Sequence, residues 1–389
     1  MKAIDLSQGS TMAPDVSITR CADYGEEAVY RAVARAVESA GGMASFAGSG
    51  ERILIKPNLL AAKPTDRAVT THPSVVKAVI RLVKEAGAYP LVGDSPGLGS
   101  ARKVAARCGV LEVCEQTGTP LVELKTLVIA QNPGGHTFKR LEVAKEAIEA
   151  DGIINIPKVK THAQMHLTLG VKNLFGCVPG KRKPQWHLSA GVDSLHFASM
   201  LLDLYEFLSP RLTVADGIVA MEGNGPGNGD PKELGLIFCS TDCVAMDTVI
   251  AEVLGARARE VPILRAAGMR GAKGADLEKI TVTGEEIKDV RAEGFRFPPP
   301  LRLNFAASLP YFLDKRLRKA LTSRPHIDTS FCSLCKVCVE VCPAQIMKKT
   351  NRITIDYDSC IRCYCCQEMC PHGAISARDG WLKRLIPGF

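Results

Sequence analysis

CSLCKVCVEVCP at positions 332–343 and CIRCYCCQEMCP at 360–371 share one cysteine pattern, C-x2-C-x2-C-x3-C-P. Eight thiols therefore recur in the same register within one short segment, and chance is a poor explanation for such a repeat. Thiolates clustered in this way are typical of metal ligation in a reducing compartment. The repeat predicts a small metal-binding domain in this part of the chain.

The distribution of the cysteines argues against a disulfide framework. Nine of the fifteen lie between Cys332 and Cys370, in a chain of 389 residues whose start, Met1 to Arg20, carries early acidic residues and no apolar core. Disulfide frameworks belong mainly to small secreted domains. The six scattered cysteines are expected to be buried small side chains: Cys21, Cys108, Cys114, Cys177, Cys239 and Cys243. Cys365, the surplus thiol of the second motif, is interpreted as a packing residue.

The two motifs resemble the bacterial two-cluster ferredoxins throughout their length. In that family the first three cysteines of one motif and the last cysteine of the other bind the same [4Fe–4S] cluster. The resemblance implies two [4Fe–4S] clusters and low-potential electron transfer. One cluster would be held by Cys332, Cys335, Cys338 and Cys370, and the other by Cys342, Cys360, Cys363 and Cys366.

The larger part of the chain alternates strand and helix patterns. Strands are predicted at Arg52 to Lys56, Leu91 to Asp94, Gly152 to Ile156, Leu212 to Asp216 and Leu234 to Cys239, and helices at Ser74 to Ala86 and Val244 to Leu254. This alternation predicts an α/β fold with a mostly parallel sheet and helices on both faces, plus a small C-terminal ferredoxin-like iron–sulfur domain. The expected boundaries are 1–300 for the α/β domain, 301–325 for a basic linker and 326–389 for the iron–sulfur domain. Sites in such sheets lie beyond the carboxyl ends of the strands.

Polar motifs follow the predicted strands. They include Lys56-Pro57-Asn58, Thr71-His72-Pro73, Gly93-Asp94-Ser95-Pro96-Gly97, Lys158-Val-Lys160-Thr161-His162, Lys172-Asn173, Asp216-Gly217 and Glu222-Gly223-Asn224-Gly225-Pro226. Together they resemble the iron–sulfur-associated proteins described as domain-of-unknown-function family 362, over about residues 50 to 255. A cluster domain on the C-terminal side is a common companion in that family, whose reaction the resemblance does not name.

These motifs bring cations and backbone donors to one rim of the sheet, if their loops share that rim. Such a rim suits an anionic ligand such as a phosphate, a carboxylate or a carboxylated tetrapyrrole. The candidate catalytic residues are His72, His162 and Lys160, with one of the two histidines as proton donor. The candidate ligand- or cofactor-binding residues are Lys56, Asn58, Asp94, Lys158, Lys172, Asn173, Asp216 and Glu222. Each of them has a structural alternative, a surface charge for a lysine and a helix cap for an aspartate.

The glycine-rich stretch EGNGPGNG at 222–229 is expected to let backbone approach a ligand closely. It matches neither a P-loop nor a dinucleotide-binding fingerprint. The net charge of +8 is modest for this length, so nucleic acid is not the expected partner, and apolar runs are too short to span a membrane. A cytoplasmic protein with a redox partner is expected. The basic stretch 301–325 is interpreted as a connecting helix, with docking to an acidic partner or a membrane surface as alternatives.

Three functions remain open at this point. The first is an enzyme, or a component of one, whose clusters deliver electrons to an anionic ligand in the α/β domain. The second is a dedicated electron carrier whose large domain only docks a partner. The third is a cluster-assembly or maturation factor.

Overall fold

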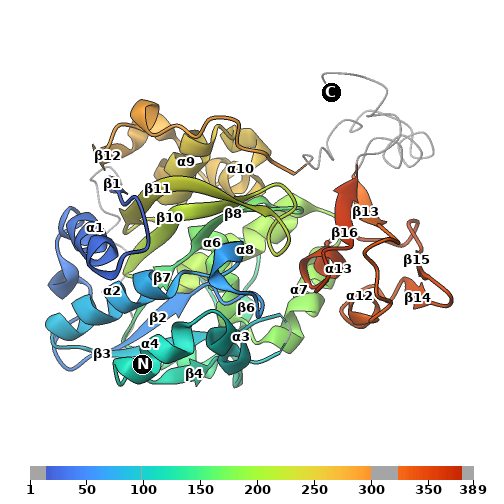
Figure 1. Cartoon of the computed structure of the whole chain (residues 1–389), viewed down its shortest axis with the longest axis horizontal. Helices are drawn as coiled ribbons and strands as arrows, with labels where there is room; N and C mark the ends of the chain where they lie inside the picture. The colour runs from blue at the N-terminus through green and yellow to red at the C-terminus, as the bar shows by residue number, and fades with distance from the viewer. Residues whose placement is uncertain (1–14, 98, 299–322, 379–389) are drawn as a thin grey trace.

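The computed structural model describes residues 15–97, 99–298 and 323–378. The α/β domain is built on a ten-stranded sheet whose main path has the order β12-β1-β11-β10-β7-β2-β3-β4 (Figure 1). These strands are β1 (Asp15–Arg20), β2 (Arg52–Pro57), β3 (Tyr89–Asp94), β4 (Leu121–Glu123), β7 (Gly152–Ile156), β10 (Leu212–Glu222), β11 (Asp230–Ser240) and β12 (Thr281–Gly284). Off this path, β8 (Lys158–His162) pairs with β10 and with β9 (His166–Thr168).

The sheet is mostly parallel, as predicted. The run β4, β3, β2, β7 and β10 is parallel throughout, whereas β11 is antiparallel to both of its neighbours, β10 and β1. The central parallel strands β2, β7 and β10 are almost entirely buried and contain β-branched residues, as in β7, GIINI. Such strands need cover on both faces.

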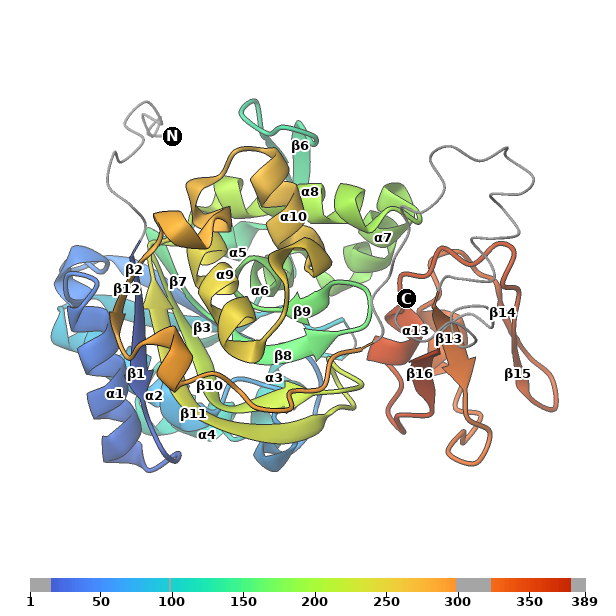
Figure 2. The ribbon, with the colours of Figure 1, turned by 90° about the horizontal axis from the view of Figure 1, so that it is seen from above.

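Helices provide that cover on both sides of the sheet (Figure 2). One apolar core joins the sheet to α1 (Glu26–Glu38), α2 (Pro73–Glu85), α3 (Ala101–Arg107) and α4 (Val110–Gln116). The other joins it to α8 (Ser194–Leu208), α9 (Cys243–Leu254) and α10 (Pro262–Met269). Along β11 the side chains alternate between the two cores, because successive residues of a strand point to opposite faces: Leu236 and Phe238 belong to one core, Ile237 and Cys239 to the other.

The predicted strands and helices are confirmed, with one difference in length. Strands β10 and β11 each run for 11 residues, well beyond the predicted Leu212 to Asp216 and Leu234 to Cys239. The extension is an antiparallel ribbon, and its register shifts between Gly217 and Val219. The added part of β11 begins with the largely polar stretch DPKE, whereas the added part of β10 contains the apolar run IVAM after Asp216-Gly217. The ribbon ends in the loop 223–229, which reaches the iron–sulfur domain.

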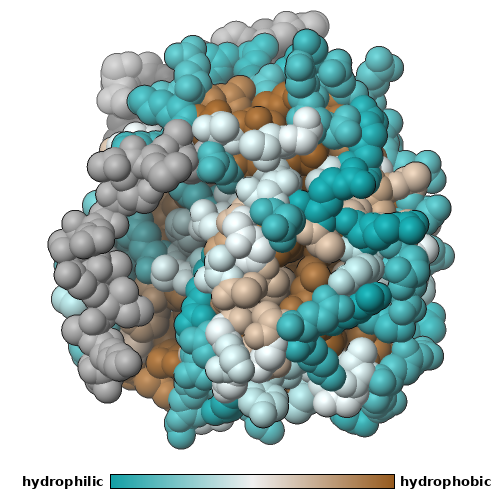
Figure 3. All heavy atoms as spheres, turned by 90° about the vertical axis from the view of Figure 1, so that its left-hand side faces the viewer, coloured by the Kyte–Doolittle hydropathy of each residue, from teal (hydrophilic) through white to brown (hydrophobic). Residues whose placement is uncertain are grey.

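Smaller elements complete the α/β domain. A separate antiparallel pair is formed by β5 (Leu127–Gln131) and β6 (Arg140–Ala144). The short helices are α5 (Lys145–Ile148), α6 (Gly170–Asn173) and α7 (Lys183–Ala190). The face turned away from the iron–sulfur domain is mostly hydrophilic, with separate apolar areas between polar residues (Figure 3).

The iron–sulfur domain is formed by two strand pairs and two short helices. β13 (Arg324–Ile327) pairs with β16 (Ile375–Arg378), and β14 (Met347–Lys349) with β15 (Ile353–Ile355). The helices α12 (Val337–Glu340) and α13 (Cys365–Glu368) each begin one residue before the third cysteine of their motif and contain it. Most of the predicted linker helix, at 299–322, and the end of the chain from 379 lie outside the described residues.

Candidate functional site

Two cavities in the iron–sulfur domain are each lined by four cysteines. The first encloses about 330 Å³ and is lined by Cys332, Cys335, Cys338 and Cys370. The second encloses about 320 Å³ and is lined by Cys342, Cys360, Cys363 and Cys366. Each cavity thus combines three thiols of one motif with the last thiol of the other. These are the sets that the ferredoxin resemblance implies, and their all-thiolate donors fit a [4Fe–4S] cluster.

The backbone around both cavities repeats in conformation as well as in sequence. Leu334 and Lys336 in the first motif have φ values of 57° and 70°, and Arg362 and Tyr364, at the same places in the second motif, have 56° and 59°. Non-glycine residues rarely adopt this left-handed region. Alternating turns of this kind direct successive N–H groups into one concavity, which suits a negatively charged group.

The iron–sulfur domain docks on the α/β domain through α13 and the loop 223–229. The Gln367 amide nitrogen donates to Asn224 Oδ1 at 2.8 Å and to the Gly225 carbonyl at 2.9 Å. The Asn228 side chain donates to the Cys370 carbonyl at 3.2 Å. Lys63 Nζ donates to the Pro371 carbonyl at 2.9 Å, which adds a second attachment point.

These contacts give the glycine-rich loop a role in docking, in addition to the expected approach to a ligand, and Pro226 of the loop lines the cleft between the domains. Two glycines of the loop approach other backbone closely: within the α/β domain, a Cβ at Gly225 would lie 2.3 Å from the Thr161 carbonyl oxygen, and at the docking surface, one at Gly227 would lie 3.3 Å from that of Glu368. The sequence alone indicated only the approach to a ligand, because the contact between this loop and the iron–sulfur domain depends on how the two domains pack.

A cleft of about 740 Å³, partly open to solvent, lies between the two domains. On the α/β side its polar lining includes Asn58, Asp94, Lys160, His162, Lys172, Asn173, Lys183 and His187, and on the iron–sulfur side it is lined by Val341, Cys365, Glu368 and Met369. Concave sites between domains that bring several polar side chains together are common places for small molecules to bind. The cleft therefore brings six predicted site residues of the α/β domain together with the helix that carries Cys366.

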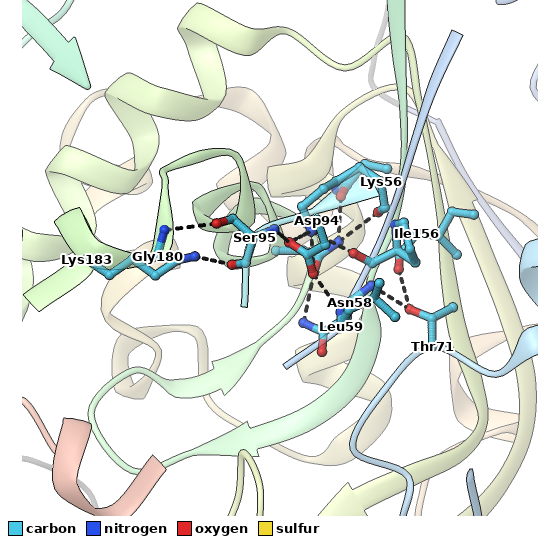
Figure 4. A network of polar contacts seen from close by, with 12 residues as sticks. Lys56, Asn58, Leu59, Thr71, Asp94, Ser95, Ile156, Gly180 and Lys183 are labelled. Atoms are coloured by element: carbon cyan, nitrogen blue, oxygen red, sulfur yellow. Dashed lines mark hydrogen bonds and ion pairs between the residues drawn. The ribbon is translucent and has the colours of Figure 1, made fainter. Parts of the chain in front are cut away.

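A buried ion pair lies at one wall of the cleft, where Asp94 belongs to the lining and its partner Lys56 does not (Figure 4). Lys56 Nζ lies 3.0 Å from Asp94 Oδ1, and both side chains are almost fully buried. Asp94 also accepts from the backbone N–H groups of Leu59 at 2.6 Å and Ser95 at 2.7 Å. Lys56 and Asp94 thus satisfy each other and fix the loops that follow β2 and β3.

Lys160 also lines the cleft, and both acceptors of its ammonium group are neutral. Its Nζ donates to Asn58 Oδ1 at 2.9 Å and to the Val69 carbonyl at 2.6 Å, and Asn58 is held in turn by Asn173. Burial lowers the pKa of Lys160 to about 7, although the carboxylate of Glu368 favours the charged form. A group with this pKa can take up or release a proton near neutral pH.

Lys172 and Lys183 contribute two more ammonium groups. Lys172 Nζ lies 4.7 Å from the centre of the Phe175 ring, a cation–π arrangement. Lys183 donates to the Ser95 carbonyl. Burial lowers the pKa of both lysines, that of Lys183 to about 8.

His162 presents one ring nitrogen to the cleft. Its Nδ1 accepts from the backbone N–H groups of Gln164 at 3.1 Å and Met165 at 3.2 Å. An Nδ1 that accepts leaves the proton of the neutral ring on Nε2. That Nε2 is buried without a hydrogen-bond partner among the described residues. Burial and the nearby lysines keep the pKa of His162 well below its usual value, so the neutral ring is a hydrogen-bond donor.

Five predicted site residues do not line this cleft: Lys56, which is paired with Asp94, and His72, Lys158, Asp216 and Glu222. Lys158 Nζ forms a buried ion pair of 2.9 Å with Asp216 Oδ2, and both residues bind the Tyr24 hydroxyl. His72 stacks on the Tyr24 ring with centroids 3.6 Å apart. Glu222 is paired with Arg296 at 2.8 Å. The structure therefore separates these residues from the cleft, whereas a single rim was expected.

Several lining residues were missed by sequence reasoning. Lys183 lies in the basic run KRKPQWH at 181–187, which follows no strand and so gave no signal. Glu368, Met369 and Cys365 lie within the second cysteine motif, which the sequence analysis interpreted only as a cluster-binding segment. The six scattered cysteines of the α/β domain are buried, as predicted.

The architecture and the site define an α/β protein joined to an iron–sulfur domain, and comparison with known proteins agrees. Residues 53–252, just over half of the chain, match the family described as a domain of unknown function, DUF362, and the chain belongs to this family. Residues 324–371 match the 4Fe-4S dicluster domain, so this is an iron–sulfur protein with at least one 4Fe–4S site and a redox or electron-transfer role.

Two individual proteins are similar to this chain. The thylakoid-associated protein sll1697 of Synechocystis sp. (strain ATCC 27184 / PCC 6803 / Kazusa) is 43% identical over 255 residues, which cover 66% of this chain and 79% of that protein. The lactate racemase apoprotein from Thermoanaerobacterium thermosaccharolyticum overlaps with a TM-score of 0.39 and 13% identity, over 60% of this chain and 55% of that one. Within the described parts of the chain, every helix is too short or too polar to cross a bilayer.

Proposed function

We propose that this protein is an iron–sulfur oxidoreductase, or a component of one, that exchanges electrons with an anionic small molecule bound in the cleft between its domains. One observation carries the proposal. The helix α13 lines the cleft with Cys365 and Glu368, and it also carries Cys366, a candidate cluster ligand. A molecule in the cleft would therefore lie against the helix that supplies a cluster ligand, which is how a fold positions a cofactor for reaction.

The thiol sets support two [4Fe–4S] clusters. The first would be held by Cys332, Cys335, Cys338 and Cys370, and the second by Cys342, Cys360, Cys363 and Cys366. Bound there, the clusters supply one-electron redox chemistry. A redox partner protein that reaches the iron–sulfur domain is part of this proposal.

The side chains of the cleft supply the anion-binding groups. Lys172 and Lys183 provide positive charge, and the Nε2–H of His162 provides a directed donor. Lys160 holds the exchangeable proton at Nζ, because its pKa of about 7 lies closer to neutral pH than that of either candidate histidine. This assignment gives proton transfer to Lys160 and hydrogen bonding to His162.

The proposal is tested with inorganic phosphate as the probe, by calorimetry on the anaerobically purified full chain. Lys160→Met and Lys172→Met each remove one ammonium group of the cleft, and Lys125→Met changes an exposed lysine that does not line it. We expect the first two variants to bind phosphate at least about tenfold more weakly. The control should bind phosphate like the wild type, and all three should retain the cluster absorbance.

Two further results would favour the alternative functions. Wild-type protein that binds neither phosphate nor a small carboxylate would favour the dedicated electron carrier. Net transfer of iron to an apo-ferredoxin during incubation would favour the cluster-assembly factor.

A further inference from the structure

Glu368 places the carboxylate of the iron–sulfur domain inside the cationic cleft. Its Oε2 lies 3.8 Å from His162 Nε2, and its side chain is 15% exposed. Of the surrounding charges, the Glu368 carboxylate does most to favour the protonated form of Lys160, and also that of Lys172. A carboxylate contributed by one domain thus faces two lysines and a histidine contributed by the other.

The repeat offers an internal comparison. Glu340 takes the same place in the first motif, two residues before the last cysteine, as Glu368 takes in the second. Glu340 is exposed and does not line the cleft. The position itself therefore does not require a buried carboxylate, and the burial of Glu368 follows from docking.

The cleft has more cations than its own carboxylates neutralise. In the part of the chain that the structure describes, no carboxylate lies within ion-pairing distance of Lys160, Lys172 or Lys183, whereas Asp94 is paired with Lys56. Buried ammonium groups without a counter-charge are costly. Glu368 relieves part of this cost from a distance too long for a hydrogen bond.

The Nε2 atom of His162, which has no hydrogen-bond partner among the described residues, is a further sign of a ligand site. This atom is a donor aimed into the cleft, and the ring is 2% exposed. A buried donor left unpaired costs free energy comparable to a lost hydrogen bond. A compact oxyanion between His162, Lys160 and Lys172 would satisfy this donor and both charges together.

We propose that the cleft takes an oxyanion, the carboxylate or phosphate group of the small molecule, at the place that the Glu368 carboxylate occupies. This inference rests on the proposed function and deepens it. Glu368 is an internal competitor for the anion, and a bound anion displaces it. Because Glu368 is the last residue of α13, its displacement loosens the contact between α13 and the α/β domain.

Phosphate titration of matched variants tests the proposal. Glu368→Gln removes the competing charge, and Glu340→Gln removes the equivalent exposed charge from the other repeat. We expect Glu368→Gln to bind inorganic phosphate about tenfold more tightly than the wild type, and Glu340→Gln to bind it like the wild type. If the site binds a carboxylate as well as a phosphate, the affinities of the three proteins for acetate should have the same order as their affinities for phosphate.

The outcomes separate this inference from the proposed function. Phosphate binding by the wild type that is equally tight in Glu368→Gln would overturn the competitor role alone. Absence of phosphate and acetate binding in all three proteins would overturn the anion cleft, and this inference with it.

Hydrogen exchange on the wild type gives a second test that needs no variant. Saturating phosphate should speed amide exchange in residues 365–370 and leave exchange in the equivalent residues 337–342 unchanged. Slower or unchanged exchange in residues 365–370 at saturating phosphate would contradict displacement of Glu368.

Discussion

Cys365 and Cys366 are neighbours on α13, yet they line different cavities: Cys366 faces the second thiol-lined cavity, and Cys365 faces the interdomain cleft. Successive residues of a helix point about 100° apart, so one helix can present a thiol to each side. The surplus thiol of the second motif therefore belongs to the cleft wall.

This arrangement predicts different effects on iron content. Cys365→Ala should keep all of the iron, about eight per chain, whereas Cys366→Ala should retain about four. Anaerobic iron analysis and visible absorbance measure both. The double variant Cys365→Ala/Cys366→Ala checks whether Cys365 replaces its neighbour, since rescue would leave more iron in Cys366→Ala than in the double variant. Loss of iron from Cys365→Ala alone would contradict its place in the cleft wall.

The crossed cysteine sets predict which cluster each substitution damages. Cys370 lines the first cavity with Cys332, although it lies in the second motif. Cys370→Ala should therefore give the electron paramagnetic resonance spectrum of Cys332→Ala in the reduced protein, and not that of Cys360→Ala. Matching spectra for Cys370→Ala and Cys360→Ala would refute the crossed sets.

Much of the fold could be predicted because local patterns determine it. Apolar runs such as that of β7 and helical periodicity such as that of α2 identify buried elements directly. The extension of β11 could not be found in this way, because its stretch DPKE is largely polar, and that of β10 was missed because Asp216-Gly217 interrupts the strand pattern before IVAM.

The candidate site was predictable only in part, and the reason is electrostatic pairing. Lys158 and Lys160 are two residues apart on β8, and the sequence treats them alike. In the structure Lys158 has a carboxylate partner in Asp216, whereas Lys160 has only neutral acceptors and lines the cleft. Which lysine is left for a ligand depends on partners that are far away in the sequence. The place of Glu368 in the cleft could not be predicted from the sequence for the same reason, because it depends on how the two domains dock.

The buried pair of Lys158 and Asp216 should be a stability element. Asp216→Asn would leave the Lys158 ammonium buried without its carboxylate, and we expect a loss of about 3–5 kcal/mol in the free energy of unfolding. Glu285→Gln, which breaks the exposed pair with Arg20, should cost about 0–1 kcal/mol. Urea unfolding of the α/β domain compares the two midpoints. Equal shifts in both variants would show that burial does not set the strength of this pair.

The depressed pKa of Lys160 predicts how anion binding depends on pH. Burial lowers this pKa to about 7 against the charges of Glu368 and Asp94, while Lys158 and Lys172 act in the same direction as burial. The ammonium form predominates below pH 7 and is lost as the pH rises through this value, so anion affinity should be highest below pH 7. Above it, affinity should fall by at most about tenfold per pH unit for this group.

Sulfate is the suitable probe for this dependence, because its charge is constant over the range. Calorimetry in buffers of different ionisation enthalpy should detect proton uptake on sulfate binding at pH 8. Lys160→Met should abolish the step near pH 7 and retain a later one from Lys183, whose pKa is about 8. A wild-type affinity that is flat from pH 6 to pH 8 would contradict the assignment of Lys160.

Gly225 should control docking of the iron–sulfur domain without affecting its clusters. A Cβ at this position would lie 2.3 Å from the Thr161 carbonyl oxygen, and the Gly225 carbonyl itself accepts from Gln367. Gly225→Ala must therefore shift the loop 223–229 and weaken its hold on α13. Gly134→Ala is the matched control, because a Cβ there meets nothing within 4 Å. We expect faster amide exchange in residues 365–370 for Gly225→Ala only, with unchanged iron content in both variants. Because displacement of Glu368 by phosphate is coupled to the same loosening of α13, Gly225→Ala should bind phosphate at least as tightly as the wild type, and weaker binding would contradict this coupling.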